Sequence, residues 1–242
     1  MKICCFSAGV SSAMAAYLAR GVDHVFYIHI EEQHPDSLRF LHDVEKLLGR
    51  EIEIMQSPYK SVENVIRQTR FIKSAFGAAC TGRLKRQVRK EWEQKQNEPL
   101  IYVWGFDVGE RDRAQRLIEA MPLQTHEFPL IEAGLDKEQV HGLARRLGLK
   151  RPIPYDQGFP NNNCLPCVKM GMGSFNLVRK LYPEAFDRMA RLEREIGHSC
   201  LKECFLDELA PDRGNPNTEI LEECGIMCQL AWVDSGILKE GE

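Results

Sequence analysis

The chain has 242 residues, of which 43% are hydrophobic and 28% are charged, and its formal net charge is −3. This composition is typical of a soluble globular protein and excludes an intrinsically disordered one. The sequence has no secretory leader and no apolar run near the roughly 20 residues of a membrane helix, so we expect a cytoplasmic protein without a membrane partner. The small negative charge provides no global attraction for nucleic acid.

Segments rich in β-branched and aromatic residues alternate with amphipathic segments along the first 150 residues. The predicted strands cover residues 2–6, 22–30, 51–55, 100–106 and 125–131. The predicted helices cover residues 12–20, 36–48, 61–72, 83–95, 110–120 and 136–147, with Ser61 as a candidate N-cap. This alternation predicts an α/β fold with a parallel five-stranded doubly wound, Rossmann-like sheet.

The composition changes after residue 150. Prolines, glycines and three consecutive asparagines at 161–163 mark a loop-rich segment, and one further helix is predicted over 183–196. We therefore expect an α/β domain over 1–150 and a cysteine-rich segment over 151–242. We expect this segment to pack over the carboxyl edge of the sheet.

The loop after the first strand consists of small residues. Small side chains let backbone N–H groups turn toward an anion, and the following helix adds the positive end of its dipole. Ligands of open α/β sheets bind at the carboxyl ends of the strands, where this loop lies. The loop predicts a phosphate site, and a tight turn packed with small residues is the alternative. The residues concerned are Ser7, Ala8, Gly9, Ser11 and Ser12.

Nine cysteines in a cytoplasmic chain favour metal binding or redox chemistry over disulfides. Cys164 and Cys167 have the spacing at which two thiolates chelate one metal from a turn. A redox dithiol is the alternative for this pair. Cys4 and Cys5 lie in the first predicted strand, and we expect them to be small buried hydrophobes.

Two later cysteine pairs have helical spacing, Cys200 with Cys204 and Cys224 with Cys228. If the helix over 183–196 continues through the first pair, its two thiols share one face. Four late cysteines that hold a structural zinc are one interpretation of this pattern.

Five basic residues crowd the predicted helix over 83–95, namely Arg83, Lys85, Arg86, Arg89 and Lys90. A solvated helix face is one interpretation. A clamp on a phosphate or sulfate group is the other, and we assign it to Arg83 and Lys85. The remaining three are expected to be solvent charges or nucleic-acid contacts.

Charged residues also follow the fourth predicted strand, at the carboxyl edge where a ligand would bind. Arg111, Arg113 and Arg116 are spaced along the next helix, and Glu110 is expected to orient one of them. A charged outer helix face is the alternative. His34 follows the second strand, either as a satisfied turn residue or near a ligand, while Trp92 and Trp104 are expected in the core.

Several of these stretches resemble the PP-loop adenine nucleotide α-hydrolase superfamily, and above all its PAPS reductase-like branch. FSAGVSSAMAAYLA resembles the PP-loop, with Ala8 in place of its first glycine and Ser11 in place of its aspartate. IHIEEQHPDSLRFLHDVEKLLG, IYVWGFDVGERDRAQR and FPLIEAGLDKEQVHGLARRLGL are similar to later segments of the family. ACTGRLKRQVRKEWE and NNNCLPCVKMGMGSFN are similar to phage PAPS reductase-like proteins and to DNA-phosphorothioation sulfur enzymes.

The resemblance implies an adenine nucleotide, ATP or PAPS, with magnesium as an accompanying ion. His34, Gly105, Glu110 and Arg111 would border the nucleotide beside the loop after the first strand. It also implies a [4Fe–4S] cluster on Cys80 and the later Cys-x-x-Cys, for which we take the set Cys80, Cys164, Cys167 and Cys228. Zinc stays as the alternative metal.

The stretch Glu223-Cys224-Gly225-Ile226 resembles the tail of sulfonucleotide reductases, in which the cysteine attacks the sulfate sulfur. Met227 stands where that tail has histidine. Cys224 is thus a candidate nucleophile or a metal ligand. A thiolate nucleophile requires a lowered pKa, which a neighbouring Arg or Lys provides.

Three functions compete at this point. The first is ATP-dependent sulfur transfer, in which an acceptor in a nucleic acid or small molecule is adenylated and pyrophosphate is released. The second is reduction of PAPS or APS to sulfite through Cys224, with a thioredoxin-type reductant. The third is a non-catalytic nucleotide-binding module with structural zinc. The oligomeric state, monomer or homodimer, stays open.

Overall fold

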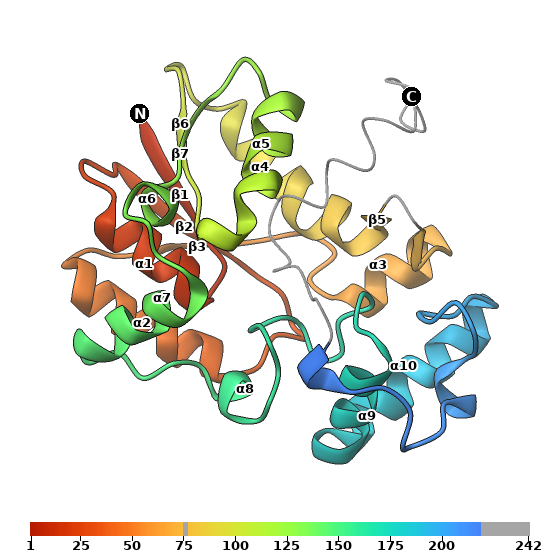
Figure 1. Ribbon diagram of the computed structural model, residues 1–242. Coiled ribbons are helices and arrows are strands. Elements are labelled where there is room, and N and C mark those ends of the chain that lie inside the picture. Colours follow the sequence, from red (N-terminus) through yellow and green to blue (C-terminus); the bar gives the residue numbers. More distant parts are fainter. Residues whose placement is uncertain (75–76, 219–242) are drawn as a thin grey trace. The chain divides into compact units, whose positions relative to one another are not determined.

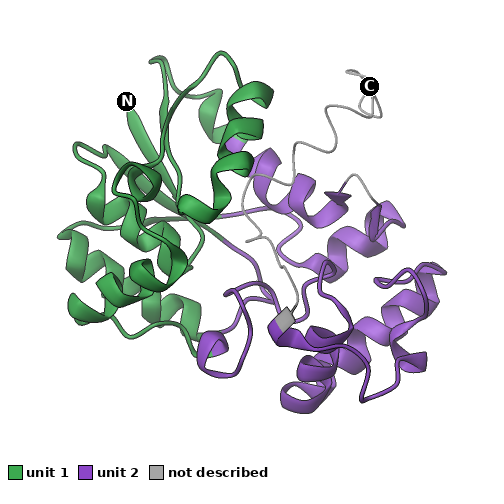
Figure 2. Cartoon of the chain, viewed as in Figure 1, with its two compact units in different colours: residues 1–28, 35–55, 90–153 green, residues 29–34, 56–89, 154–242 purple. Residues whose placement is uncertain are grey.

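The computed structural model describes residues 1–74 and 77–218, and its elements are drawn in Figure 1. The chain divides into two compact units, which Figure 2 colours separately. Unit 1 comprises Met1–Ile28, Pro35–Met55 and Lys90–Ile153, and unit 2 comprises His29–His34, Gln56–Arg89 and Pro154–Glu242. The second unit therefore combines the cysteine-rich segment with two stretches from the first half of the chain.

Unit 1 is built on the predicted five-stranded parallel sheet, whose strand order is β3-β2-β1-β6-β7. The central strand β1 pairs on both sides, since its Ile3 lies opposite His24 of β2 and Tyr102 of β6. The order reverses between β1 and β6, so the loops after these strands border the switch point where open α/β sheets bind ligands. The strands are β1 (Lys2–Phe6), β2 (His24–His29), β3 (Glu53–Gln56), β6 (Ile101–Val103) and β7 (Thr125–Glu127).

The helices of unit 1 begin and end at local signals. Asp136 caps α7 by accepting a hydrogen bond from the Gln139 N–H at 2.8 Å, and Gly49 ends α2 with a left-handed φ of 64°. The helices of this unit are α1 (Val10–Leu18), α2 (Asp36–Leu48), α4 (Gln87–Glu93, which begins in unit 2), η2 (Val108–Glu110), α5 (Arg111–Ala120), α6 (Pro129–Glu132) and α7 (Lys137–Arg146).

Several predicted elements of the first 150 residues have other bounds in the structure. The strand expected over 100–106 ends at Val103, and the helix expected over 61–72 ends at Thr69. The strand expected over 125–131 ends at Glu127, because Pro129 occupies the first turn of α6. The helix expected over 83–95 begins earlier, as the π-helical turn η1 (Thr81–Arg86) that leads into α4. The described residues contain no helix with the length and apolar character needed to cross a membrane.

Unit 2 is mostly helical around an apolar core. Ser61 caps α3 as predicted, since its hydroxyl accepts a hydrogen bond from the Asn64 N–H at 3.1 Å. The core is formed by α3, η1, the loop at 164–170, α9, α10 and the segment at 200–209. The elements are α3 (Val62–Thr69), the antiparallel β4 (Lys73–Ser74) and β5 (Gly77–Ala78), η1, α8 (Ile153–Asp156, which begins at the end of unit 1), α9 (Met172–Leu181), α10 (Pro183–Ile196), η3 (Leu206–Glu208) and η4 (Pro216–Thr218).

Candidate functional site

The loop between β1 and α1 is held together by the Ser12 hydroxyl. This hydroxyl accepts a hydrogen bond from the Ser7 N–H at 3.1 Å and donates one to the Gly9 carbonyl at 2.9 Å. The Ser7 hydroxyl oxygen also lies 3.1 Å from the Ser12 hydroxyl oxygen. Ala8 has a positive φ of 58°, which is unusual for a residue with a side chain and is typical of ligand-binding turns.

The same loop leads into the first turn of α1, whose N-cap is Gly9. The first N–H groups of a helix have no acceptor within the helix, and they favour an anion. Ser11 and Ser12 in this turn are buried. The predicted phosphate-binding residues therefore form one compact turn at the carboxyl end of the central strand.

Gly105, after β6, lies directly against this turn. A Cβ atom at Gly105 would come within 2.7 Å of the Ser12 backbone nitrogen and 2.9 Å of the Ser11 carbonyl carbon. Distances below 3.0 Å require one of the two backbones to move. A glycine is therefore needed at position 105, where the loop after β6 meets the loop after β1. The family resemblance implies that Gly105 borders the nucleotide beside this same loop after β1.

Glu110 and Arg113 form an ion pair within unit 1, in agreement with the expected orienting role of Glu110. The Arg113 guanidinium lies 4.7 Å from the centre of the Phe106 ring, and its side chain is only 7% exposed. Arg111 and Arg116 are exposed on α5. Arg113 is therefore the buried cation among the three arginines of α5. The family resemblance instead implies that Arg111 borders the nucleotide.

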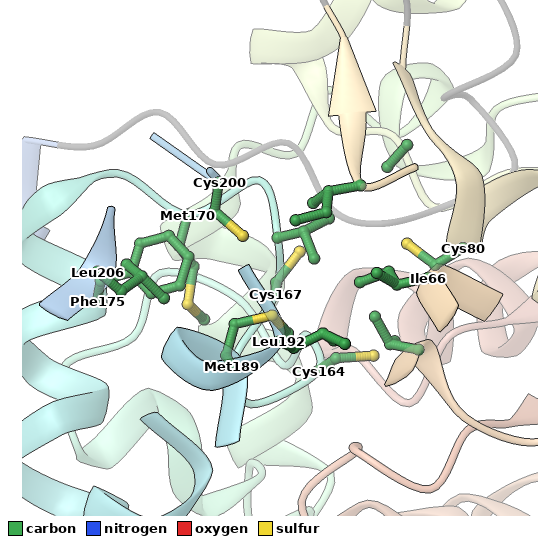
Figure 3. Packing of buried hydrophobic residues seen from close by; sticks show 14 of the residues in the cluster. Ile66, Cys80, Cys164, Cys167, Met170, Phe175, Met189, Leu192, Cys200 and Leu206 are labelled. Atoms are coloured by element: carbon green, nitrogen blue, oxygen red, sulfur yellow. The ribbon is translucent and has the colours of Figure 1, made fainter. Parts of the chain in front are cut away.

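In unit 2, three cysteines from two segments that are distant in sequence line one small cavity. They are Cys80 at the start of η1 and the pair Cys164 and Cys167, and all three are buried. Lys85 lines the same cavity and is itself buried, with 9% of its surface exposed. The structure thus places Cys80 at the same cavity as the Cys-x-x-Cys pair, and Figure 3 labels all three residues.

Glu32 ties the segments around this cavity together. Its carboxylate accepts hydrogen bonds from the N–H groups of Val62 at 2.8 Å and Glu63 at 3.0 Å, at the start of α3. Its carbonyl accepts the N–H of Leu165, between the paired cysteines, at 2.8 Å. Burial raises the pKa of Glu32, and the backbone hydrogen bonds act in the opposite direction. Glu32 therefore positions the Cys-x-x-Cys loop on α3.

A fourth cysteine belongs to the same apolar core. Cys200 is completely buried in the cluster that holds Cys80, Cys164 and Cys167. Figure 3 labels these four cysteines, which belong to three separate segments of the chain. The sequence predicted Cys228 in this position, and Cys228 lies outside the described residues.

Lys73 supplies positive charge to this group of thiols. Burial lowers the pKa of Lys73, while the charges of the Cys200 and Cys167 thiolates raise it. Burial also raises the pKa of Cys200 well above its ordinary value, and Lys73 opposes that increase. The two residues therefore interact electrostatically inside unit 2.

The cysteines fit a metal centre by their chemistry. Thiolates are the ligands of iron–sulfur clusters, in which each cysteine binds a different iron atom, and they also bind zinc. The described residues contain no group of three or more His, Cys, Asp or Glu side chains with the spacing of ligands to a single ion. The cavity has a volume of about 10 Å³, the size of one water molecule. A cluster would therefore require these side chains to move apart.

The basic helix differs from its prediction at two positions. Arg89 is 2% exposed, so it is a buried cation and not a solvent charge or nucleic-acid contact. Burial lowers the pKa of Arg86, which is half-buried. Arg83 is exposed and lies over the Tyr59 ring at 6.0 Å, whereas Lys85 faces the cysteines. The two residues assigned to one clamp therefore have different surroundings.

The remaining predicted residues are distributed as follows. His34 belongs to unit 2, where its ring meets the Tyr182 ring edge-on at 5.9 Å. Cys4 is buried, and burial raises its pKa to about 12, whereas Cys5 is half-buried. Trp104 is in the core and Trp92 is half-buried. Cys224 lies outside the described residues.

Helix α10 does not continue through Cys200 and Cys204, so these two thiols do not share a helical face. It ends at Ile196, because Gly197 has a left-handed φ of 81°. Cys200 then lies in the following loop and is buried, while Cys204 is only half-buried. The glycine after Ile196 was the signal in the sequence that this helix stops.

Compared with known proteins, the chain matches no family model and no curated protein sequence.

Proposed function

We propose that this chain is an adenine-nucleotide-dependent enzyme of sulfur chemistry, of the PAPS reductase-like type. The observation that carries the proposal is the meeting of Cys80, Cys164 and Cys167 at one cavity beside a buried lysine. Buried thiols gathered from distant segments are typical of metal ligation. The compact turn after β1, at the carboxyl end of the central strand and the start of α1, supports the nucleotide part of the proposal.

In unit 1, the nucleotide phosphates would bind the N–H groups of the turn from Ser7 to Ser12. An acceptor oxygen attacks the α-phosphorus of ATP, and the bond to pyrophosphate breaks. A sulfur nucleophile then displaces AMP from the acceptor. Neutralisation of the phosphate charge by backbone N–H groups and the helix N-terminus favours the first step. The buried Arg113 and its partner Glu110 supply a fixed charge pair in this unit.

In unit 2, Cys80, Cys164 and Cys167 would hold an iron–sulfur cluster, which supplies iron coordination and electron transfer when bound. Lys85 lines the same cavity, and a positive charge beside thiols favours the thiolate form that binds metal. Glu32 keeps the loop of the paired cysteines on α3 through the Leu165 N–H. The three cysteines would therefore bind the cluster, Glu32 would position two of them, and Lys85 would offset part of the thiolate charge.

Binding of ATP and PAPS to protein purified without oxygen tests the nucleotide part. Ser12→Ala removes the hydroxyl that ties the turn together, and we expect affinity to fall by about tenfold, equivalent to about 1.4 kcal/mol. Ser61→Ala is the matched control, because it removes one helix-capping hydroxyl in unit 2. Absence of binding to both nucleotides in the unmodified protein would exclude the proposed function.

The products then decide among the three reactions. Pyrophosphate and AMP from ATP, with nucleic acid supplied as acceptor, support sulfur transfer through adenylation. Sulfite from PAPS, lost in Cys224→Ala, identifies a reductase instead. Tight nucleotide binding without any turnover identifies a binding module. Lys85→Met should lower turnover in either enzymatic case, whereas Lys90→Met, at an exposed position of α4, should not.

A further inference from the structure

We infer that Cys200 is the fourth thiol of the metal site, together with Cys80, Cys164 and Cys167, and that Glu193 is the positioning residue that holds it there. The inference rests on the proposed function, whose cysteine set it completes within the described residues. It assigns the position that the sequence had given to Cys228.

The first argument is burial within one cluster. All four cysteines belong to the same apolar core of unit 2, and Cys200 is the most deeply buried of them, with 0% of its surface exposed. Figure 3 labels all four among the side chains of this core. Cys204, four residues later, is half-buried at the edge of that core. Of this pair, only Cys200 lies with the other thiols.

The second argument is electrostatic proximity. Cys200 lies close enough to Cys80 and to Lys73 to interact electrostatically with both. Lys73 in turn interacts with both Cys200 and Cys167. Lys73 is half-buried, and its positive charge offsets part of the negative charge that a group of thiolates accumulates in an apolar core. Lys73 therefore lies near at least two of the four thiols, Cys200 and Cys167.

The third argument is the buried carboxylate of Glu193, which is 0% exposed. One carboxylate oxygen accepts the backbone N–H of Cys200, and the other accepts the N–H of Leu206 at 2.7 Å. The Glu193 carbonyl also accepts the N–H of Gly197 at 2.8 Å, where α10 ends. Burial of a carboxylate is costly unless its hydrogen bonds are well made, and here these bonds fix the loop that carries Cys200.

The test compares variants of Cys200 and Cys204 in the full chain purified without oxygen. We measure iron and acid-labile sulfide per chain, and separately the thiolate charge-transfer absorption when cadmium is added to the metal-free reduced protein. Cys200→Ala and Cys200→Ser should each lose at least half of the iron and sulfide and part of the cadmium absorption. Cys204→Ala should match the unmodified protein in all three.

The positioning role of Glu193 has its own matched pair on α10. Glu193→Gln keeps the shape of the side chain and removes its charge, so we expect a changed cluster spectrum or reduction potential in a folded protein. Glu195→Gln is the control, because Glu195 is exposed and pairs with Arg67. Unchanged spectrum and potential in Glu193→Gln would remove Glu193 from the proposal.

The outcomes separate this inference from the proposed function. Iron and sulfide that persist in both Cys200 variants but disappear in Cys228→Ala would overturn the assignment of Cys200 and leave the proposed function standing. A protein that never binds iron, but whose cadmium absorption depends on Cys200 and not on Cys204, would overturn the cluster and support the four-thiol set. Cadmium absorption that does not depend on Cys200 would overturn the inference in either case.

Discussion

Gly105→Ala should damage the turn between β1 and α1, the proposed phosphate site, through a single methyl group. The added Cβ would lie 2.7 Å from the Ser12 nitrogen, 2.8 Å from its Cα and 2.9 Å from the Ser11 carbonyl carbon. All three atoms are backbone, so no side chain can rotate away, and the turn or the strand end must shift by several tenths of an ångström. Overpacking of this kind costs about 1–3 kcal/mol of folding free energy.

The same shift moves the N–H groups proposed to bind phosphate, so nucleotide affinity should fall by about tenfold or more, that is by about 1.4 kcal/mol or more. Calorimetric titration with ATP measures the affinity, and urea unfolding measures the stability. Gly142→Ala is the matched control, because its Cβ meets only the Arg146 guanidinium at 3.6 Å inside α7. It should stabilise unit 1 by about 0.5–1 kcal/mol. Wild-type stability and affinity in Gly105→Ala would refute the reasoning.

Three other residues give predictions that do not depend on a ligand. Glu32→Gln weakens the charged cap on Val62 and should cost about 1–2 kcal/mol in urea unfolding; an unchanged midpoint would contradict the capping role. Burial and nearby cations lower the pKa of His141 from 6.5 to about 4, so the unfolded chain takes up this proton first as the pH falls. The free energy of unfolding should therefore decrease as the pH falls from 6.5 to 4. His141→Gln should reduce this dependence in unfolding measured across that pH range. An equal dependence in both proteins would exclude His141 as its source. Arg113→Lys loses contact with the Phe106 ring and should lower the melting temperature by an amount equivalent to about 1–2 kcal/mol, which unchanged melting would disprove.

The sheet and several helix boundaries could be predicted because their signals are local. The helix over 36–48 matches the observed α2, since an amphipathic period ends at a glycine that takes a left-handed conformation. The helix over 183–196 matches α10 for the same reasons, with Pro183 in its first turn. The strand over 125–131 was too long because its apolar period continued through Pro129.

The arrangement of the candidate site was harder to predict, because it depends on tertiary packing. Residue types made the cysteines candidate ligands, but only the fold places Cys200 and Cys80, 120 positions apart in sequence, in one apolar core. The role of Glu193 was missed as well, since a glutamate in an amphipathic helix is ordinarily exposed. Its burial follows from the return of the chain after Gly197, a tertiary feature that no local pattern reports.

Metal analysis of the protein purified without oxygen tests the central claim most directly. Iron, acid-labile sulfide and zinc are measured per chain, beside Cys164→Ala and the control Cys5→Ala in β1. The account predicts iron with matching sulfide in the unmodified protein and in the control, and its loss in Cys164→Ala. Stoichiometric zinc without iron, or no metal at all, would contradict the proposed iron–sulfur site.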